Sequence, residues 1–200
     1  MMIKELLFSI ENYMQAGGVV MIPILVISLC MWTLIINRLL VLHRLYIKNI
    51  SRDTAGQLVK ANQQPEENYR GINSLLVRQF LAARSHDPVL DSFILDETVV
   101  RLVSSLDTHL GAIRVMAGVA PLLGLLGTVI GMMETFDVIT IFGTGNAKAM
   151  AGGISVALIT TQTGLMVSIP GLYMSGFLTK RANNLKYKIA ATGMYLNRFL

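Results

Sequence analysis

Hydroxyl and amide side chains lie inside long apolar stretches of this sequence. Thr128 stands in one stretch, and Thr161 and Gln162 stand in a later one, in which Ser155, Thr160 and Thr163 are also polar. Unpaired polar atoms are costly in hydrocarbon, so these side chains must face protein or water. We therefore treat Thr128, Thr161 and Gln162 as candidates for a polar lumen and an ion pathway.

Two carboxylates, Glu134 and Asp137, follow the first of these stretches. They come about 20 residues after Arg114, and at about 1.5 Å per helical residue this separation equals the roughly 30 Å of a bilayer core. We expect both carboxylates near the outer interface of a membrane. There they are either simply solvated or guard the entrance for an ion.

No arrangement of residues predicts an enzyme, a metal centre or a cofactor site. His43, His86 and His109 share no ligand spacing, and no nucleophile, base and orienting group can be assembled. The single cysteine, Cys30, excludes an intramolecular disulfide, and we expect its thiol to be buried within an apolar run. The segment 141–148 lacks the spacing of a phosphate-binding loop and follows no strand pattern.

Three uncharged stretches are long enough to cross a bilayer. Hydrophobic residues make up 53% of the chain and charged residues only 14%, against about 25% charged in a typical soluble domain. We predict transmembrane helices over residues 17–36, 115–138 and 149–179. A cleaved signal peptide is the competing interpretation of the first stretch, but its apolar core is about 7–15 residues and ends at a small-residue cleavage site, which is not found here.

Lysine and arginine concentrate in residues 37–114 and 180–200 and are sparse in residues 1–16 and 139–148. The positive-inside rule then places the amino terminus and the 139–148 loop in the periplasm, and the other two segments in the cytoplasm. The net charge of +5 needs no nucleic-acid partner, because the cations flank the spans. The predicted fold is an all-α integral membrane protein with three transmembrane helices, an outside amino terminus and long helical cytoplasmic extensions.

The polar segments also show helical patterns. Residues 1–16 predict an amphipathic helix on the periplasmic side. Within 37–114 we expect one helix from Arg38 to about Asn62 and another from about Ile72 to Arg84. A third should begin at Pro88, with Asp87 as its N-cap, and run into the second span. The third carries an apolar stripe that needs a partner helix, and its members are Val99, Leu102, Val103, Leu106, Leu110 and Ile113.

Small residues recur at spacings of three and four along one face of the second and third predicted spans. These faces and the prolines within or beside them include Pro121, Gly124, Gly131, Ala157, Gly164 and Pro170. Small residues allow helices to approach closely in lipid. The faces serve either plain helix packing or, together with their hydroxyl groups, a ring of subunits around a polar lumen. The first span, with bulky side chains such as Leu29 and Trp32, is expected to face membrane lipid.

Two segments resemble a known family. The run from Ala120 to Gly131 is similar to the APxxGLxGTVxGM signature of the ExbB/TolQ/MotA proton-channel family, and the run from Met150 to Thr161 resembles that family's third span. The second similarity continues through Gly164-Leu165 and Ile169-Pro170. Three spans, where the MotA branch has four, make the chain similar to the ExbB/TolQ branch.

The resemblance implies a homopentamer in the bacterial inner membrane that encloses two single-span helices of an ExbD-like or TolR-like partner. An aspartate of that partner carries the proton. Thr128 and Thr161 match the family's pore-lining threonines, whereas Val156 stands where the family usually has a glutamate. Valine cannot titrate, so the resemblance gives more weight to the partner's aspartate and to polar groups such as Gln162.

The implied output is a coupling of the proton motive force to work on a TonB-like or TolA-like protein, for outer-membrane import or envelope maintenance. A non-conducting structural scaffold for a single-span membrane partner is the alternative from another class. A third interpretation is an unrelated three-span transporter subunit.

Overall fold

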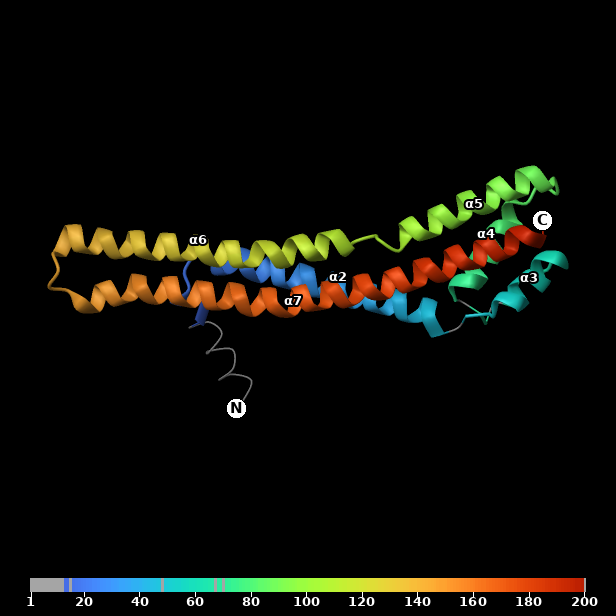
Figure 1. The fold of residues 1–200 in the computed structure, drawn as a ribbon. Coiled ribbons are helices and arrows are strands. Elements are labelled where there is room, and N and C mark those ends of the chain that lie inside the picture. The colour runs from blue at the N-terminus through green and yellow to red at the C-terminus, as the bar shows by residue number, and fades with distance from the viewer. Residues whose placement is uncertain (1–12, 15, 48, 67, 70, 200) are drawn as a thin grey trace, which may run out of the picture. The chain divides into compact units, whose positions relative to one another are not determined.

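The computed structural model describes residues 13–14, 16–47, 49–66, 68–69 and 71–199, and all regular structure in this part of the chain is helical (Figure 1). The predicted helix over 1–16 lies mostly outside the described residues. The elements are α2 (Met21–Ile47), α3 (Arg52–Lys60), α4 (Ile72–Ala83), α5 (Pro88–Ser105), α6 (Leu110–Phe142), α7 (Ala147–Leu196) and the short 3-10 helix η1 (Asn197–Phe199).

Three helical segments are long and apolar enough to cross a membrane: α2, the segment that ends with α6, and the segment that contains α7. The all-α membrane fold is thus confirmed. The predicted spans 115–138 and 149–179 lie inside α6 and α7. The helix of the first span begins at Met21 and not at residue 17, because Gly18 adopts a positive φ of 66° that is incompatible with a right-handed helix.

The chain divides into two units. We name Met1–Ile35 with Ala112–Ser175 the apolar unit, and Ile36–Gly111 with Gly176–Leu200 the charged unit. The apolar unit contains most of α6, the first half of α7 and the start of α2. The charged unit contains α3, α4 and α5 together with the ends of α2 and α7.

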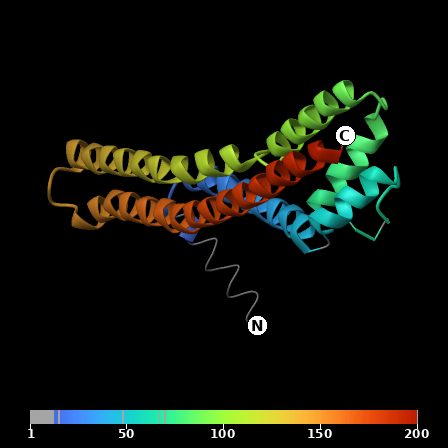
Figure 2. The ribbon, with the colours of Figure 1, turned by 45° about the vertical axis from the view of Figure 1, so that its right-hand side comes forward.

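In the apolar unit, α6 and α7 run antiparallel and side by side (Figures 1 and 2). The turn between them begins at Gly143, whose φ of 68° ends α6 and whose N–H bonds the carbonyl of Ile139 at 2.9 Å. The Asn146 side chain then accepts a hydrogen bond from the N–H of Ala149 at 3.2 Å and caps the start of α7. This short connection forces the two helices to be neighbours.

The expected continuous helix from Arg38 to about Asn62 is wrong. Helix α2 ends at Ile47, and α3 begins at Arg52 after Ser51, whose hydroxyl accepts a hydrogen bond from the N–H of Thr54 at 3.1 Å. A serine at this position starts a new helix, because its side chain satisfies a backbone N–H that the first turn leaves unpaired.

The helix expected from Ile72 is confirmed as α4, and so is the N-cap of α5, where Asp87 accepts from the N–H of Val89 at 2.9 Å. The expectation that α5 runs unbroken into the second span is wrong. Helix α5 ends at Ser105, and His109 has a positive φ of 64° just before α6. The Arg38 guanidinium donates to the carbonyl oxygens of Ser105, at 2.9 Å, and Leu106, so this break is stabilised by a residue far away in the sequence.

The charged unit has a conventional apolar core, in which Leu76, Phe80, Leu95 and Ile189 are fully buried. The predicted apolar stripe from Val99 to Ile113 begins on α5 and ends on α6, and at Val99 its partner helix is α7. A Cβ added at Gly193 would lie 2.6 Å from Cγ2 of Val99, so the two helices are in close contact there.

Candidate functional site

The small-residue faces of α6 and α7 bring the two helix backbones into contact. A Cβ added at Gly131 would lie 2.5 Å from the carbonyl oxygen of Gly153, and one at Gly164 would lie 2.7 Å from that of Ala120. At Gly124 the corresponding distance to the Thr160 oxygen is 2.9 Å. Contacts below 3.0 Å leave no room for a side chain, so only glycine permits this approach.

The other small residues of the predicted faces lie in the same helix pair. Ala157 is buried, and its backbone N would lie 2.8 Å from a Cβ at Gly131. Pro121 and Pro170 lie inside α6 and α7 and are half-buried. On the neighbouring helix α2, the buried side chain of Met31 faces Gly171, where an added Cβ would lie 2.5 Å from its sulfur.

The two predicted pathway threonines are half-buried, and each hydroxyl donates its proton to a backbone carbonyl of its own helix. Thr128 donates to the carbonyl of Leu125 at 2.6 Å, and Thr161 donates to that of Ala157 at 3.0 Å. The carbonyl oxygen of Gly124 also lies 3.4 Å from the Thr161 hydroxyl, across the helix pair. Each hydroxyl oxygen therefore keeps lone pairs that can accept a hydrogen bond from a proton carrier.

Gln162 and Val156 flank these residues along α7. Gln162 is exposed in the isolated chain and Val156 is half-buried. Thr160 is fully buried, and its hydroxyl bonds the carbonyl oxygens of Val156 at 2.9 Å and Ala157 at 3.1 Å. The polar cluster at 160–163 is thus divided between the contact of α6 with α7 and an exposed face. It stays a prediction that a lumen contains Thr128, Thr161, Gln162 and Val156.

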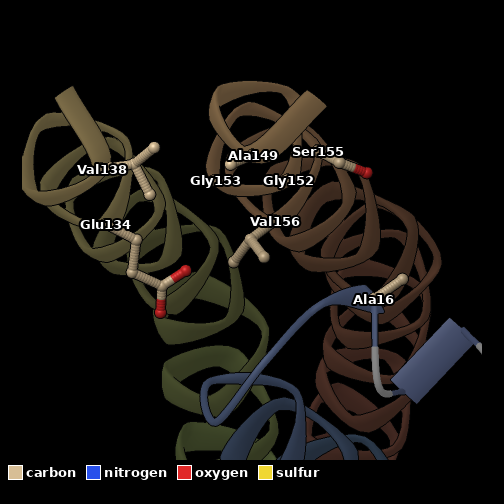
Figure 3. Close-up of a pocket in the computed structure, with 8 residues that line it drawn as sticks. All are labelled: Ala16, Glu134, Val138, Ala149, Gly152, Gly153, Ser155 and Val156. Atoms are coloured by element: carbon tan, nitrogen blue, oxygen red, sulfur yellow. The ribbon is translucent and has the colours of Figure 1, made fainter. Parts of the chain in front are cut away.

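A cavity of about 500 Å³ opens between α6 and α7 near their connecting turn, and among the described residues that line it Glu134 is the only ionisable one (Figure 3). Figure 3 shows the side chains of Glu134 and Val156 projecting from facing helices toward the gap. The lining residues are Ala16, Glu134, Val138, Ala149, Gly152, Gly153, Ser155 and Val156. Glu134 and Asp137, one turn further on, are both exposed in the single chain, and Asp137 is not among the residues that line the cavity.

Sequence reasoning placed Glu134 near the outer interface but missed the cavity. One signal was present, because Glu134 follows Gly131 by three residues and therefore lies beside the small-residue face of α6. The expectation for Cys30 was wrong, since this thiol is exposed on α2. Among the described residues, no group of three or more His, Cys, Asp and Glu side chains could hold a metal ion.

Comparisons with known proteins agree with this geometry. Residues 61–191 match the family described as the MotA/TolQ/ExbB proton channel family, and this range contains both small-residue faces. The chain is 31% identical over 193 residues to a Synechocystis protein described as biopolymer transport protein ExbB-like 1, covering 90% of this chain and 74% of that protein.

Two further relatives match shorter segments. A Methanothermobacter thermautotrophicus protein described as a biopolymer transport protein ExbB homolog is 31% identical over 70% of this chain and 53% of its own length. The Aquifex aeolicus biopolymer transport protein ExbB is 38% identical over 40% of this chain and 55% of its own length. The chain therefore spans only about half the length of these two relatives.

Proposed function

This chain belongs to the MotA/TolQ/ExbB proton channel family, and we propose that it is an inner-membrane motor subunit that couples the proton motive force to work on a TonB-like or TolA-like protein. The observation that carries the proposal is the glycine-mediated contact of α6 and α7, which leaves Thr128 and Thr161 half-buried beside it with free acceptor lone pairs.

The exposed surface of the three long helices supports an assembly. In the single chain, only 22% of the most apolar 18-residue stretch of α2 is buried. The same fraction is buried in the most apolar stretch of the segment that contains α7. Lipid covers part of this surface, and further copies of the chain cover the rest. We propose a homopentamer around two single-span helices of an ExbD-like or TolR-like partner. The copy numbers follow from the resemblance to the family, and a closed ring gives each copy the same contacts.

In this assembly the partner's aspartate carries the proton. A protonated carboxyl is neutral and can pass an apolar lumen, whereas an ionised one is held back. The hydroxyl oxygens of Thr128 and Thr161 then accept the hydrogen bond that the protonated carboxyl donates. Gln162 adds a polar contact, and Val156 keeps its part of the lumen dry. Each proton supplies about 2.3 kcal/mol per 100 mV of membrane potential.

The test is to co-express this chain with a single-span protein encoded beside it that carries an intramembrane aspartate. The purified complex is counted for chains by native mass spectrometry and reconstituted for proton flux. We expect five copies of this chain, two partner helices and flux that disappears when the partner's aspartate becomes asparagine. A stable complex without wild-type flux would instead favour the structural scaffold.

We propose that the 143–146 turn lies in the periplasm and the charged unit in the cytoplasm. The distribution of lysine and arginine supports this orientation. Gly145 has open space around an added Cβ, so a Gly145→Cys variant in a Cys30→Ser background suits the test. A membrane-impermeant maleimide should label this cysteine from the periplasmic side of intact cells, and labelling only after lysis would reverse the orientation.

A further inference from the structure

We propose that the charged unit contains a binding site for the phosphate group of an anionic phospholipid, in a cavity between α2 and α7. The cations of this site are Arg181 and Lys188. The proposal goes beyond the proposed function, because it assigns a lipid ligand and needs only that the three long helices cross a membrane. Its failure would therefore leave the proposed motor function untouched.

The cavity has a volume of about 150 Å³, and all of its lining residues belong to the charged unit. They are Leu42 and Tyr46 of α2, and Arg181, Asn184 and Leu185 of α7. Both leucines are buried, whereas Tyr46 and Asn184 are exposed and Arg181 is half-buried. The cavity therefore combines an apolar side with an open polar side. Its volume is several times the roughly 30 Å³ that one molecule occupies in liquid water, so a phosphate group fits.

Two cations of α7 lie over aromatic rings and not beside carboxylates. The Cζ atom of Arg181 lies 4.9 Å from the centroid of the Phe177 ring, and the Nζ atom of Lys188 lies 4.3 Å from that of the Tyr46 ring. Among the ion pairs of the described residues, none includes Arg181 or Lys188. The face of a ring attracts a cation but does not neutralise its charge. Both charges therefore remain available to an anion beside the cavity.

The two helices that form the cavity contain no aspartate or glutamate along their whole length. Within the charged unit, two of their cations are already used by the chain itself. Arg38 of α2 bonds carbonyl oxygens at the break between α5 and α6, and Lys186 of α7 pairs with Asp107. Arg181 and Lys188 have no acid on either helix to compensate them, which favours an anion from outside the chain.

The position of the cavity along the chain favours a lipid headgroup as this anion. Lys180 and Arg181 are the first charged residues after the uncharged stretch 149–179, which is the predicted third span. Side chains of a helix lean toward its amino terminus, and Arg181 lies over Phe177, one turn back toward that span. The headgroup layer extends roughly 5–7 Å beyond the hydrocarbon core. A guanidinium two residues past the span therefore lies at the depth of lipid phosphates.

A phosphodiester headgroup matches the side chains of this cavity. Its negatively charged oxygens accept hydrogen bonds from the Arg181 guanidinium and the Lys188 ammonium. The Asn184 amide and the Tyr46 hydroxyl can donate further hydrogen bonds. Free phosphate offers the same oxygens, but only a lipid is held at this depth by its acyl chains. Basic pockets between membrane helices on the cytoplasmic side are typical sites for anionic headgroups.

The first experiment titrates the detergent-purified full chain with phosphatidylglycerol and counts bound lipids by native mass spectrometry. We expect one phosphatidylglycerol per chain. The affinity for phosphatidylethanolamine should be about fivefold lower or less, because its ammonium cancels the charge of the phosphate. An excess of inorganic phosphate should not displace the lipid. Equal affinity for the two lipids, or displacement by inorganic phosphate, would overturn the lipid site.

The second experiment repeats the titration with substituted chains. Arg181→Gln and Lys188→Gln should each lower the affinity for phosphatidylglycerol about fivefold, since one cation near a headgroup contributes about this factor. Asn184→Trp should also lower it, because the larger side chain fills the cavity while both cations remain. The matched control is Lys180→Gln, which removes a charge from the same helix but not from the lining. This control should leave the affinity unchanged.

Two results of the second experiment would contradict the proposal. An equal loss in Lys180→Gln would mean that the basic end of α7 attracts anionic lipid without a defined site. If Arg181→Gln leaves lipid binding intact and lowers the number of chains per complex, the cation contacts carboxylates of another copy, and the lipid site is wrong. Because the Asn184 side chain is exposed, Asn184→Trp should fold normally and decides the question even if Arg181→Gln does not fold.

Discussion

The apolar unit and the charged unit hold their helices together with different side chains. Between α6 and α7, Gly124, Gly131 and Gly164 allow backbone to touch backbone. In the charged unit, large side chains such as Phe80 and Leu95 fill the space between helices. The ion pairs of the described residues all lie in the charged unit: Arg84–Asp91, Arg101–Glu97 and Lys186–Asp107.

This difference in side-chain size at the helix contacts follows from the surroundings of each unit, which are lipid for the apolar unit and water for the charged unit. In water, burial of large apolar side chains stabilises helix contacts by about 25 cal/mol per Å². In lipid this gain is absent, because the lipid tails are as apolar as the side chains, and close van der Waals packing takes its place. The contact between α6 and α7 therefore depends on the absence of side chains, whereas the helix contacts of the charged unit depend on their size.

The largest effect is expected from adding a side chain to the glycine contact. Gly164→Leu should separate α6 from α7 and prevent assembly, because a Cβ there already lies 2.7 Å from the Ala120 carbonyl oxygen. Size-exclusion chromatography of the purified complex measures this. Gly118→Leu is the matched control on α6, since nothing lies within 4 Å of a Cβ at Gly118. Normal assembly of both variants would show that the glycine contact does not hold the pair together.

The converse change in the charged unit is the removal of a large side chain. Phe80 is fully buried, and Phe80→Ala should destabilise this unit by about 3–5 kcal/mol through lost burial and a cavity. The loss of unfolding free energy is measured by chemical denaturation, with hydrogen exchange of the α4 amides as the readout. A cost below about 1 kcal/mol would contradict the view that side-chain size stabilises this unit.

The buried ion pair of the charged unit predicts a dependence on pH. Asp91 lies on α5, before the predicted span 115–138, and its side chain is only 2% exposed, with Arg84 at 3.0 Å. Burial alone raises the pKa of Asp91, but the backbone N–H of Ser85, the Arg84 guanidinium and the Ser85 hydroxyl outweigh it and hold this pKa below its ordinary value of 3.8.

Because the pKa of Asp91 is lowered in the folded state, its contribution to stability is complete above pH 3.8 and is lost as pH falls through the lower folded value. Asp91→Asn should cost about 3 kcal/mol at neutral pH, since it leaves Arg84 without its charged partner. Denaturation curves at neutral and acidic pH measure both effects, and the difference between wild type and variant should shrink in acid. A difference that is constant with pH would refute this role.

A smaller structural effect is expected at the threonines of the apolar unit. Thr128→Val together with Thr161→Val keeps the shape and removes hydroxyls whose shorter hydrogen bonds are to their own helix, apart from the 3.4 Å contact of Thr161 with the Gly124 carbonyl, so stability should change by less than about 1 kcal/mol. Assembly should survive while proton flux falls. Full flux in this double variant would exclude the two hydroxyl groups from the pathway.

The smallest effect is expected at the exposed pair of Arg101 and Glu97, both 69% exposed on α5. Glu97→Ala should change the free energy of unfolding by about 0.5 kcal/mol or less, because water and salt screen exposed pairs. Comparison with Asp91→Asn in the same denaturation assay separates a buried from an exposed charge pair. Similar losses in the two variants would mean that burial does not decide the strength of these pairs.

Local patterns in the sequence were sufficient for much of this protein. The uncharged runs, the spacing of Gly124, Gly131 and Gly164, and Asp87 before Pro88 each predicted a feature that the structure contains. These features depend on residues within a few helical turns of one another, where the geometry of the α-helix alone determines which side chains share a face.

Tertiary structure decided the features that join distant segments. The break between α5 and α6 is stabilised by Arg38, which lies 67 residues before Ser105. No local sequence pattern predicts that the Arg38 guanidinium bonds this break. The cavity at Glu134 exists because the antiparallel helices place Val156 opposite it. The helical period specifies which face of a helix a residue occupies. Which other helix packs against that face depends on the path of the chain between the helices, and only the packed structure shows it.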